Sequence, residues 1–430
     1  MACSIDARAR NSPTALRCIG IILGLFALVL PSVHAEPTLD DAELAVVSAL
    51  RKMASGDALG AQRVLEPIIK SKPYFQLAQL VYADALQTLA GRGPELSIAQ
   101  AQAQLRALRQ EALVRSRYVL NERQARAMPA NALPDVLIKA ADDVRHAIVV
   151  DAQASRLLLF ERGPQGLRLT RDHYVSIGKK GARKDREGDQ RTPVGVYFVT
   201  ARIKADTLPD FYGVGALPVN YPNEWDMRLG RTGYGIWIHG VPSDTYARPP
   251  RASDGCMALS NEHLSDLLRI QNTLEMPVII ADTLNWVSPD DIQRQRREWV
   301  KRIEDWRTDW ESRDQRRYAR HYASSFETGG YDQSSWLAYK ARVNGQKKYI
   351  RVGVKRLSLY RYPGEHDMVV ASFEQDYRSD NFAQESQKRQ YWRKDIDGQW
   401  RIVYEGAVRL SPEHLRGIPY SARARLTSLD

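Results

Sequence analysis

The chain has 430 residues and a formal net charge of +11, from 62 lysines and arginines against 51 aspartates and glutamates. Hydrophobic residues make up 43% and charged residues 26%, which are the fractions of a folded protein and exclude a largely disordered or fibrous chain. This length exceeds one ordinary hydrophobic core, so we expect two to four domains. The positive charge favours an anionic polymer or a lipid surface as the partner.

The first 35 residues have the pattern of a secretory signal peptide. Arginines precede a short apolar run, and small residues follow it. These features are Arg8, Arg10 and Arg17, the run Ile19–Leu30 and the site Val33–Ala35. Because the run is short for a membrane span and a cleavage site follows it, we expect residues 1–35 to be removed and the protein to be exported. An uncleaved membrane anchor is the alternative.

The cysteine content of the chain indicates a chemical role for one thiol. Cys3 and Cys18 lie in the expected signal peptide, which leaves Cys256 as the one cysteine of the mature sequence. Exported proteins usually pair their thiols, so a lone thiol favours a chemical role. The alternative is a buried cysteine that packs as a small hydrophobic residue.

Residues 36–128 carry a helical pattern, in which Leu44, Val47 and Leu50 share one face of a first helix. Further helices are expected over residues 58–69, 71–89 and 97–117. The first helix returns as the third after about 34 residues, which predicts a tetratricopeptide-like repeat that binds a protein partner or supports the rest of the chain. A plain helical bundle is the alternative.

Residues 129–144 contain two prolines and are expected to be a linker. The β-rich block that follows, over residues 145–286, opens with a hairpin signal. Its expected strands are Ala147–Asp151, Arg156–Phe160, His173–Gly178, Gly195–Val199, Ile236–His239 and Val278–Asp282. These strands predict a small, mainly antiparallel sheet.

Residues 293–410 have the pattern of a separate α+β domain. A long charged helix or helix pair over residues 293–326 carries tryptophans at near-helical spacing, and strand-like segments follow. Those segments are Tyr349–Val354, Leu357–Tyr362, Met368–Tyr377, Lys388–Lys394 and Trp400–Glu405, with a hairpin turn at Asp397-Gly398. The domain has no cysteine and no convincing catalytic cluster. Residues 411–430 are expected to be a C-terminal tail.

His239 and the lone Cys256 are the candidate catalytic residues. His239 ends an apolar strand pattern, and the proline-containing loop Val241–Ala252 leads from it toward Cys256. Such a pair supplies a thiol nucleophile and a base that holds a thiolate near neutral pH. Gly255 allows backbone N–H groups to turn toward an incoming carbonyl as an oxyanion hole. A metal site needs more ligands than nearby His263 supplies, so we expect none.

The block over residues 145–286 resembles the L,D-transpeptidase catalytic domain (YkuD type). The family signature is His-Gly, a loop and Ser-x-Gly-Cys, and the chain has His239-Gly240 and Ser253-Asp254-Gly255-Cys256. Upstream segments that also resemble the family are Lys179, Gly188-Asp189, Arg191-Thr192-Pro193 and Gly195-Val196-Tyr197.

The resemblance implies chemistry on peptidoglycan stem peptides in the periplasm or cell envelope, with no cofactor and no nucleic acid. Cys256 is then the nucleophile that attacks the carbonyl of an L-centre followed by a D-residue. His239 is the base, Gly240 offers a carbonyl that orients the imidazole, and Ser253 and Gly255 shape the turn. Further candidates for substrate contact are Tyr234, Trp237, Asp254 and Arg191.

Two positions depart from the family pattern. Ala258 stands where most members have an arginine two residues after the cysteine, and Asp254 stands where many have histidine. A lost guanidinium removes a bidentate grip on a carboxylate or an acyl oxygen. The chain is therefore similar to the subgroup that trims stem peptides and includes cell-shape L,D-carboxypeptidases. That subgroup has a C-terminal domain similar to nuclear transport factor 2 (NTF2), which binds a glycan or peptide or forms a dimer.

The expected fold is therefore multidomain, with an all-α tetratricopeptide-like region, a mainly-β L,D-transpeptidase-like domain and an α+β NTF2-like domain. The leading function is acyl transfer through a Cys256 acyl-enzyme, and hydrolysis by an L,D-carboxypeptidase is the alternative fate of that intermediate. A non-catalytic cell-wall-binding scaffold is an alternative of another class, against which the intact Cys–His pair argues. A thiol redox protein lacks any Cys-x-x-Cys.

Overall fold

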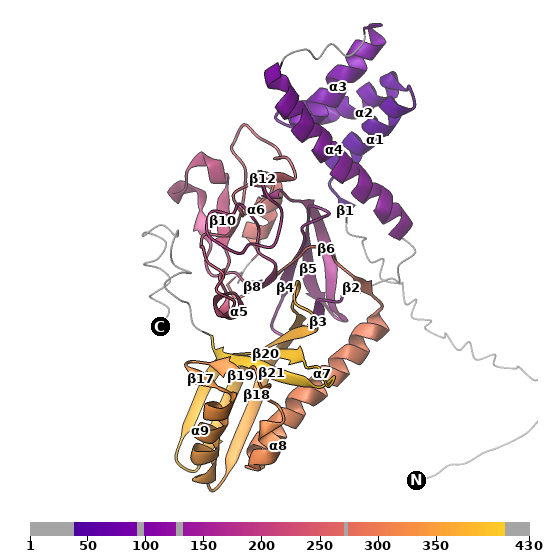
Figure 1. Cartoon of the computed structure of the whole chain (residues 1–430). Coiled ribbons are helices and arrows are strands. Elements are labelled where there is room, and N and C mark those ends of the chain that lie inside the picture. The colour runs from indigo at the N-terminus through magenta and orange to yellow at the C-terminus, as the bar shows by residue number, and fades with distance from the viewer. Residues whose placement is uncertain (1–37, 93–98, 126–131, 271–273, 409–430) are drawn as a thin grey trace, which may run out of the picture. The chain divides into compact units, whose positions relative to one another are not determined.

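The computed structural model describes residues 38–92, 99–125, 132–270 and 274–408 (Figure 1). The expected signal peptide and C-terminal tail lie outside the described residues. Within the described part of the chain, no helix is both long enough and apolar enough to span a membrane. The structure has helices first, a β-rich centre and an α+β domain last, which confirms the fold class expected from the sequence.

The N-terminal region consists of helices packed through small residues. Its helices are α1 (Asp41–Ala54), α2 (Ala58–Ser71), α3 (Gln76–Leu89) and α4 (Ala99–Ala125). Side chains of Asp40 and Asp57 accept backbone hydrogen bonds at the starts of α1 and α2, so both helices have filled N-caps. The shared core contains Ala42, Val46, Ala49, Ala61, Leu65, Ala78 and Ala85. The tetratricopeptide-like interpretation stays a prediction.

The central domain contains a six-stranded sheet in the order β1-β6-β5-β4-β14-β8. Its strands are β1 (Thr38–Leu39), β4 (His146–Asp151), β5 (Arg156–Gly163), β6 (Gly166–Tyr174), β8 (Gly195–Phe198) and β14 (Pro277–Ala281). β14 runs parallel to β4, and β1 runs parallel to β6, so the sheet is mixed. Ile148 faces one hydrophobic core and Val149 faces another. Burial on both faces explains the continuous apolar run of β4.

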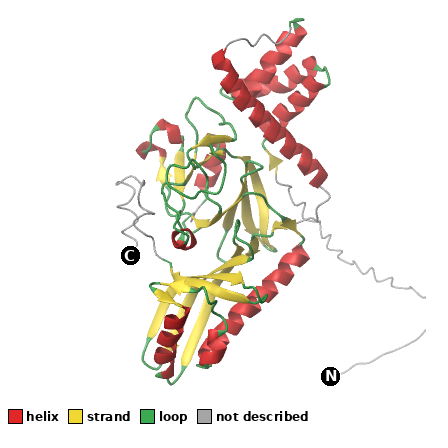
Figure 2. Cartoon of the chain, viewed as in Figure 1, coloured by secondary structure: helices red, strands yellow, loops and turns green. Residues whose placement is uncertain are grey.

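A second sheet of the central domain has the order β13-β11-β10-β9. Its strands are β9 (Ile203–Lys204), β10 (Gly215–Pro218), β11 (Trp237–His239) and β13 (Met257–Ala258). Shorter elements beside it are β7 (Ile177–Gly178), β12 (Arg251–Ser253), the 3-10 turns Ala205–Thr207 and Asp210–Tyr212, α5 (Glu224–Arg228) and α6 (Asn261–Arg269). Loops form most of the chain between β8 and β13 (Figure 2). These loops carry the candidate site.

Buried charges join the N-terminal helices to the central sheet. Arg156 of β5 forms ion pairs with Glu43 of α1 at 2.8 Å and with Asp172 of β6 at 2.7 Å. Arg115 of α4 pairs with the same Glu43 at 3.1 Å and with Glu111 at 2.8 Å. All five side chains are at most 3% exposed. Because an unpaired charge is costly at such burial, these pairs fix the helices on the sheet.

The C-terminal domain has a five-stranded sheet in the order β21-β20-β19-β18-β3. Its elements are β3 (Leu137–Lys139), α7 (Pro289–Glu311), α8 (Gln315–Ala319), β16 (Glu327–Thr328), β17 (Tyr331–Asp332), α9 (Gln333–Gly345), β18 (Ile350–Arg361), β19 (Met368–Ser379), β20 (Ala383–Lys394) and β21 (Trp400–Ala407). Trp306 and Phe373 lie in the core between helices and sheet. Tyr360 and Tyr391 pack instead in the core that contains Val149 of the central domain.

Four features differ from the sequence-based expectations. The expected single sheet of the central domain is two sheets, because β11 pairs with β10 and β13 and not with the six-stranded sheet. The expected linker contains β2 (Leu133–Pro134), which pairs with β15 (Trp286–Val287), and β3, which extends the C-terminal sheet. The apolar residues of this expected linker are buried in those strand pairings, whereas its two prolines had indicated a loop. Two expected strands form the single strand β18, which has a register shift after Lys355. Helix α9 was not expected, because its apolar residues do not gather on one face.

We predict that Glu43→Ala lowers the free energy of unfolding by about 3 to 5 kcal/mol, because it leaves two buried guanidinium groups short of a partner. Lys52→Ala is the matched control, since it removes an exposed ion pair with Asp57 and costs less than about 1 kcal/mol. Urea denaturation of both variants measures the difference. Equal stability of the two variants contradicts the role given to the buried pairs.

Candidate functional site

His239 is held at the end of β11 with a defined tautomer. Its ring is 1% exposed, and Nδ1 lies 2.7 Å from the carbonyl oxygen of Gly240. Since a carbonyl only accepts, Nδ1 carries the hydrogen, and Nε2 keeps its lone pair for a proton. The ring of Tyr212 lies 5.1 Å from the imidazole and that of Phe211 6.0 Å from it. The Gly240 carbonyl thus orients the imidazole.

Asn261 fixes the backbone that follows His239. Its side-chain amide donates to the Val241 carbonyl at 2.9 Å and accepts from the Val241 N–H at 3.2 Å. A Cβ at Gly240 would lie 2.2 Å from the same side chain, so this position is sterically restricted to glycine. Asn261 was not predicted from the sequence, because a residue at the start of a helix carries no sign of a contact made to a distant loop.

Strand pairing brings Cys256 beside β11. In the parallel pair β11–β13, Ile238 lies opposite Met257 and His239 lies opposite Ala258. One residue earlier in that register, Cys256 lies next to Trp237, and its Sγ is 3.4 Å from the Gly235 carbonyl oxygen. Side chains two residues apart on a strand share a face, so Trp237 and His239 both project on one side of β11. The structure therefore brings the predicted cysteine and histidine to neighbouring strands.

A tight turn presents Cys256. Gly255 has a φ of +132°, and a Cβ there would lie 2.8 Å from the Arg191 carbonyl oxygen, so a larger residue does not fit. Ser253 Oγ accepts from the Gly255 N–H at 3.1 Å and donates to the Cys256 carbonyl at 2.6 Å. Ser253 thus holds the turn. The Gly255 N–H is bonded to Ser253 Oγ, and the oxyanion hole expected at this turn stays a prediction.

The remaining candidates occupy different environments. Asp254 is exposed and pairs with Lys179 at 2.9 Å, while Arg191 donates to the Ala182 carbonyl at 3.0 Å. Trp237 is buried, and Cys256 packs against the small core that contains it. Tyr234 is 42% exposed, one residue before the glycine whose carbonyl faces Sγ. Their assignment to substrate contact stays a prediction.

Burial makes both members of the Cys–His pair neutral at neutral pH. It raises the pKa of the Cys256 thiol to about 11, against the lowering effect of a backbone hydrogen bond with Trp237 and of the Arg248 guanidinium. It lowers the pKa of His239 to about 4, although the hydrogen bond with Gly240 acts in the other direction. A resting thiolate near neutral pH, expected from the sequence, does not fit this burial.

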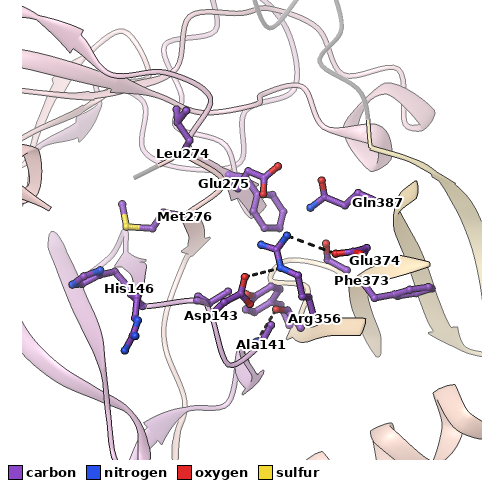
Figure 3. Close-up of a pocket in the computed structure, with 16 residues that line it drawn as sticks. Ala141, Asp143, His146, Leu274, Glu275, Met276, Arg356, Phe373, Glu374 and Gln387 are labelled. Atoms are coloured by element: carbon purple, nitrogen blue, oxygen red, sulfur yellow. Dashed lines mark hydrogen bonds and ion pairs between the residues drawn. The ribbon is translucent and has the colours of Figure 1, made fainter. Parts of the chain in front are cut away.

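The described residues form no metal site at this pair, and a cavity lined in part by β4 and β18 does not include it. Among the described residues, no three His, Cys, Asp or Glu side chains gather as a metal site needs. His263, the other histidine near the predicted pair, is mostly buried and stacks on His173 with ring centres 4.1 Å apart. A cavity of about 410 Å³ contains none of the predicted site residues. In it Arg356 pairs with Asp143 at 2.6 Å (Figure 3).

Comparison with protein families matches residues 145–280 to the L,D-transpeptidase catalytic domain (YkuD). It matches residues 298–406 to the Cds6 C-terminal NTF2-like domain. Both findings confirm the family resemblance drawn from the motifs. No curated protein sequence matches the chain.

Solved structures resemble about two thirds of the chain. Bd1075 of Bdellovibrio bacteriovorus is 28% identical, with a TM-score of 0.57, and the match covers 65% of this chain and 99% of Bd1075. The helical cell shape determining protein Pgp2 from Campylobacter jejuni is 22% identical, with a TM-score of 0.55, and the match covers 64% of this chain and 95% of Pgp2. At that identity Pgp2 supports the fold alone.

We predict that alkylation of Cys256 by iodoacetamide is slow at pH 7 and rises with an apparent pKa near 11, because the raised pKa keeps the thiol protonated below that pH. Mass spectrometry of the peptide that contains Cys256 measures the rate at each pH, with circular dichroism as the check that the protein stays folded. Urea-unfolded protein is the control, since its thiol titrates near 8.5. An apparent pKa below 8 in the folded protein contradicts the buried, neutral pair.

Proposed function

We propose that this chain, whose residues 145–280 form an L,D-transpeptidase catalytic domain, is an exported cysteine acyltransferase that acts on peptidoglycan stem peptides. The observation that carries the proposal is the register of β11 with β13, which places Cys256 next to the strand that ends in His239. The defined tautomer of that histidine leaves Nε2 as a proton acceptor. The turn held by Ser253 presents the thiol.

The reaction that this site supports begins with proton transfer. The Cys256 thiol gives its proton to His239 Nε2, and Sγ bonds to the carbonyl carbon between the L-centre and the D-residue. When the C–N bond breaks, the leaving amine takes the proton from His239, and a thioester joins the L-centre to Cys256. An amine or water then attacks the thioester, loses its proton to His239, and the thiol is restored.

Because Cys256 and His239 are both neutral before substrate binds, the substrate takes part in the ionisation of the thiol. A free thiolate is disfavoured by burial, so the proton leaves Sγ when a bound carbonyl is in place to accept the sulfur. The thiol is therefore protected from oxidation in the absence of substrate, since the thiolate is the reactive form. That protection suits a lone cysteine in an exported protein.

The fate of the thioester distinguishes two activities. Ala258 is 2% exposed and hydrogen-bonds through its backbone to Ser176, so this position offers no guanidinium to an acceptor. That absence favours water as the acceptor, which makes the chain an L,D-carboxypeptidase that removes the terminal D-alanine of tetrapeptides. Transfer to an amine is the transpeptidase outcome of the same intermediate.

The wider role that we propose is cell-wall remodelling that affects cell shape. Pgp2, which shares the fold, is described as a helical cell shape determining protein. An expected signal peptide and a periplasmic location are consistent with a peptidoglycan substrate. A protein partner of α1–α4 and a dimer through the C-terminal domain remain proposals as well.

The test is incubation of the purified protein with tetrapeptide muropeptides and chromatographic analysis of the products. We expect free D-alanine from the wild type and at least a 1,000-fold lower rate, on the order of the loss of a nucleophile, from Cys256→Ala. Cross-linked or D-amino-acid-exchanged products identify the transpeptidase instead. An unchanged melting temperature of Cys256→Ala is the control for folding. Activity that survives in this variant, or a wild type with none, contradicts the proposal, and the latter favours the scaffold.

A further inference from the structure

Arg248 is an unpaired cation beside the candidate site. The neighbouring lysines are neutralised, since Lys179 pairs with Asp254 and Lys184 pairs with Asp189 at 2.8 Å. Among the described residues, no carboxylate lies at ion-pair distance from the Arg248 guanidinium, which is half-buried. A guanidinium held in this state has donors available for an anion.

The Arg248 guanidinium lies on the side of the site where His239 lies. It lies 4.1 Å from the centre of the Phe211 ring, and its Nη2 donates to the Phe211 carbonyl at 3.1 Å. Phe211 in turn lies against the His239 imidazole. No hydrogen bond joins Arg248 to Sγ or to the imidazole among the described contacts, so the charge stands beside the reacting atoms and not on them.

The backbone around Arg248 is held from two sides. Its carbonyl accepts from the Tyr174 hydroxyl at 3.0 Å. Tyr246, two residues earlier, is buried in the core of the N-terminal helices, with its ring 4.5 Å from that of Phe75 and its hydroxyl bonded to Asp40. The loop between His239 and Cys256 is thus fixed by the helical region, and the guanidinium is positioned before any ligand binds.

The reaction geometry indicates which anion belongs there. The histidine that protonates the leaving amine must face the leaving D-residue, so that residue lies on the side where Arg248 stands. Two bonds of about 1.5 Å each put its carboxylate carbon about 2.5 Å beyond the leaving nitrogen. A tetrahedral oxyanion, by contrast, is bonded to the carbon that Sγ attacks, so its place is set by Sγ and not by the side on which the leaving residue lies.

We propose that Arg248 binds the free carboxylate of the D-residue that Cys256 displaces, so that this chain selects stem peptides ending at that residue. The inference rests on the proposed function and adds its substrate specificity.

Paired substrates test this role. One is a tetrapeptide with a free D-alanine carboxylate, and the other is the same peptide with a terminal amide. We expect the wild type to favour the acid by about 10- to 100-fold in kcat/KM, the range for one charge-assisted hydrogen bond. Arg248→Met erases the preference by lowering turnover of the acid, mainly through KM, and Arg248→Lys restores part of it. Arg251→Met is the matched control, since Arg251 is exposed at the start of β12, three residues after Arg248, and it keeps the preference.

Binding to the inactive protein gives a second readout. Calorimetry with Cys256→Ala measures the affinity for the acid and for the amide, and we expect the acid to bind about tenfold or more tightly until Arg248→Met is added. If Arg248→Met lowers kcat/KM equally for the acid and for the amide, the proposal is overturned, because such a loss indicates that Arg248 acts on the thiolate or the oxyanion. No loss on either substrate overturns it too. A wild type that releases no D-residue overturns the proposed function and this inference together, whereas Cys256-dependent release without any preference overturns the inference alone.

Discussion

The parallel pairing of β11 with β13 is the constraint on which the candidate site depends. The chain leaves β11 at His239, forms a loop, and comes back at Cys256 to β13, the strand that pairs with β11. The close approach of Gly255 to the Arg191 carbonyl fixes where the return ends. Because a register slip by one residue turns a side chain to the other face of a strand, this pairing decides whether thiol and imidazole can meet.

Burial then decides the chemistry of the pair. The same packing that fixes Sγ and the imidazole leaves His239 buried and Cys256 half-buried, and this burial keeps both groups neutral and couples ionisation to substrate binding. Arg248, on the loop between His239 and Cys256, supplies a positive charge beside the site. That loop is held at Tyr246, which packs in the core of the N-terminal helices. The helical region therefore contributes to the site although it holds none of its reacting groups.

The sequence was informative where a feature is local. Gly255 and Ser253 stand beside Cys256 in a short motif, so their part in the turn was predictable. Arg248 and Asn261 were missed because their contacts depend on how a loop folds back, which no spacing encodes. The buried pair of Glu43 with Arg156 joins segments 113 residues apart, and in the sequence Glu43 looks like an ordinary surface charge of a helix. Helix α9 lacked the apolar periodicity by which helices are recognised.

The central claim is that Cys256 forms a thioester with the stem peptide. Intact-mass spectrometry of the protein, mixed with a tetrapeptide and quenched in acid within one turnover, tests it most directly. The account predicts an added mass equal to the tripeptide acyl group, mapped by digestion to the peptide that contains Cys256. Release of D-alanine with no adduct, or an adduct on another residue, contradicts the account.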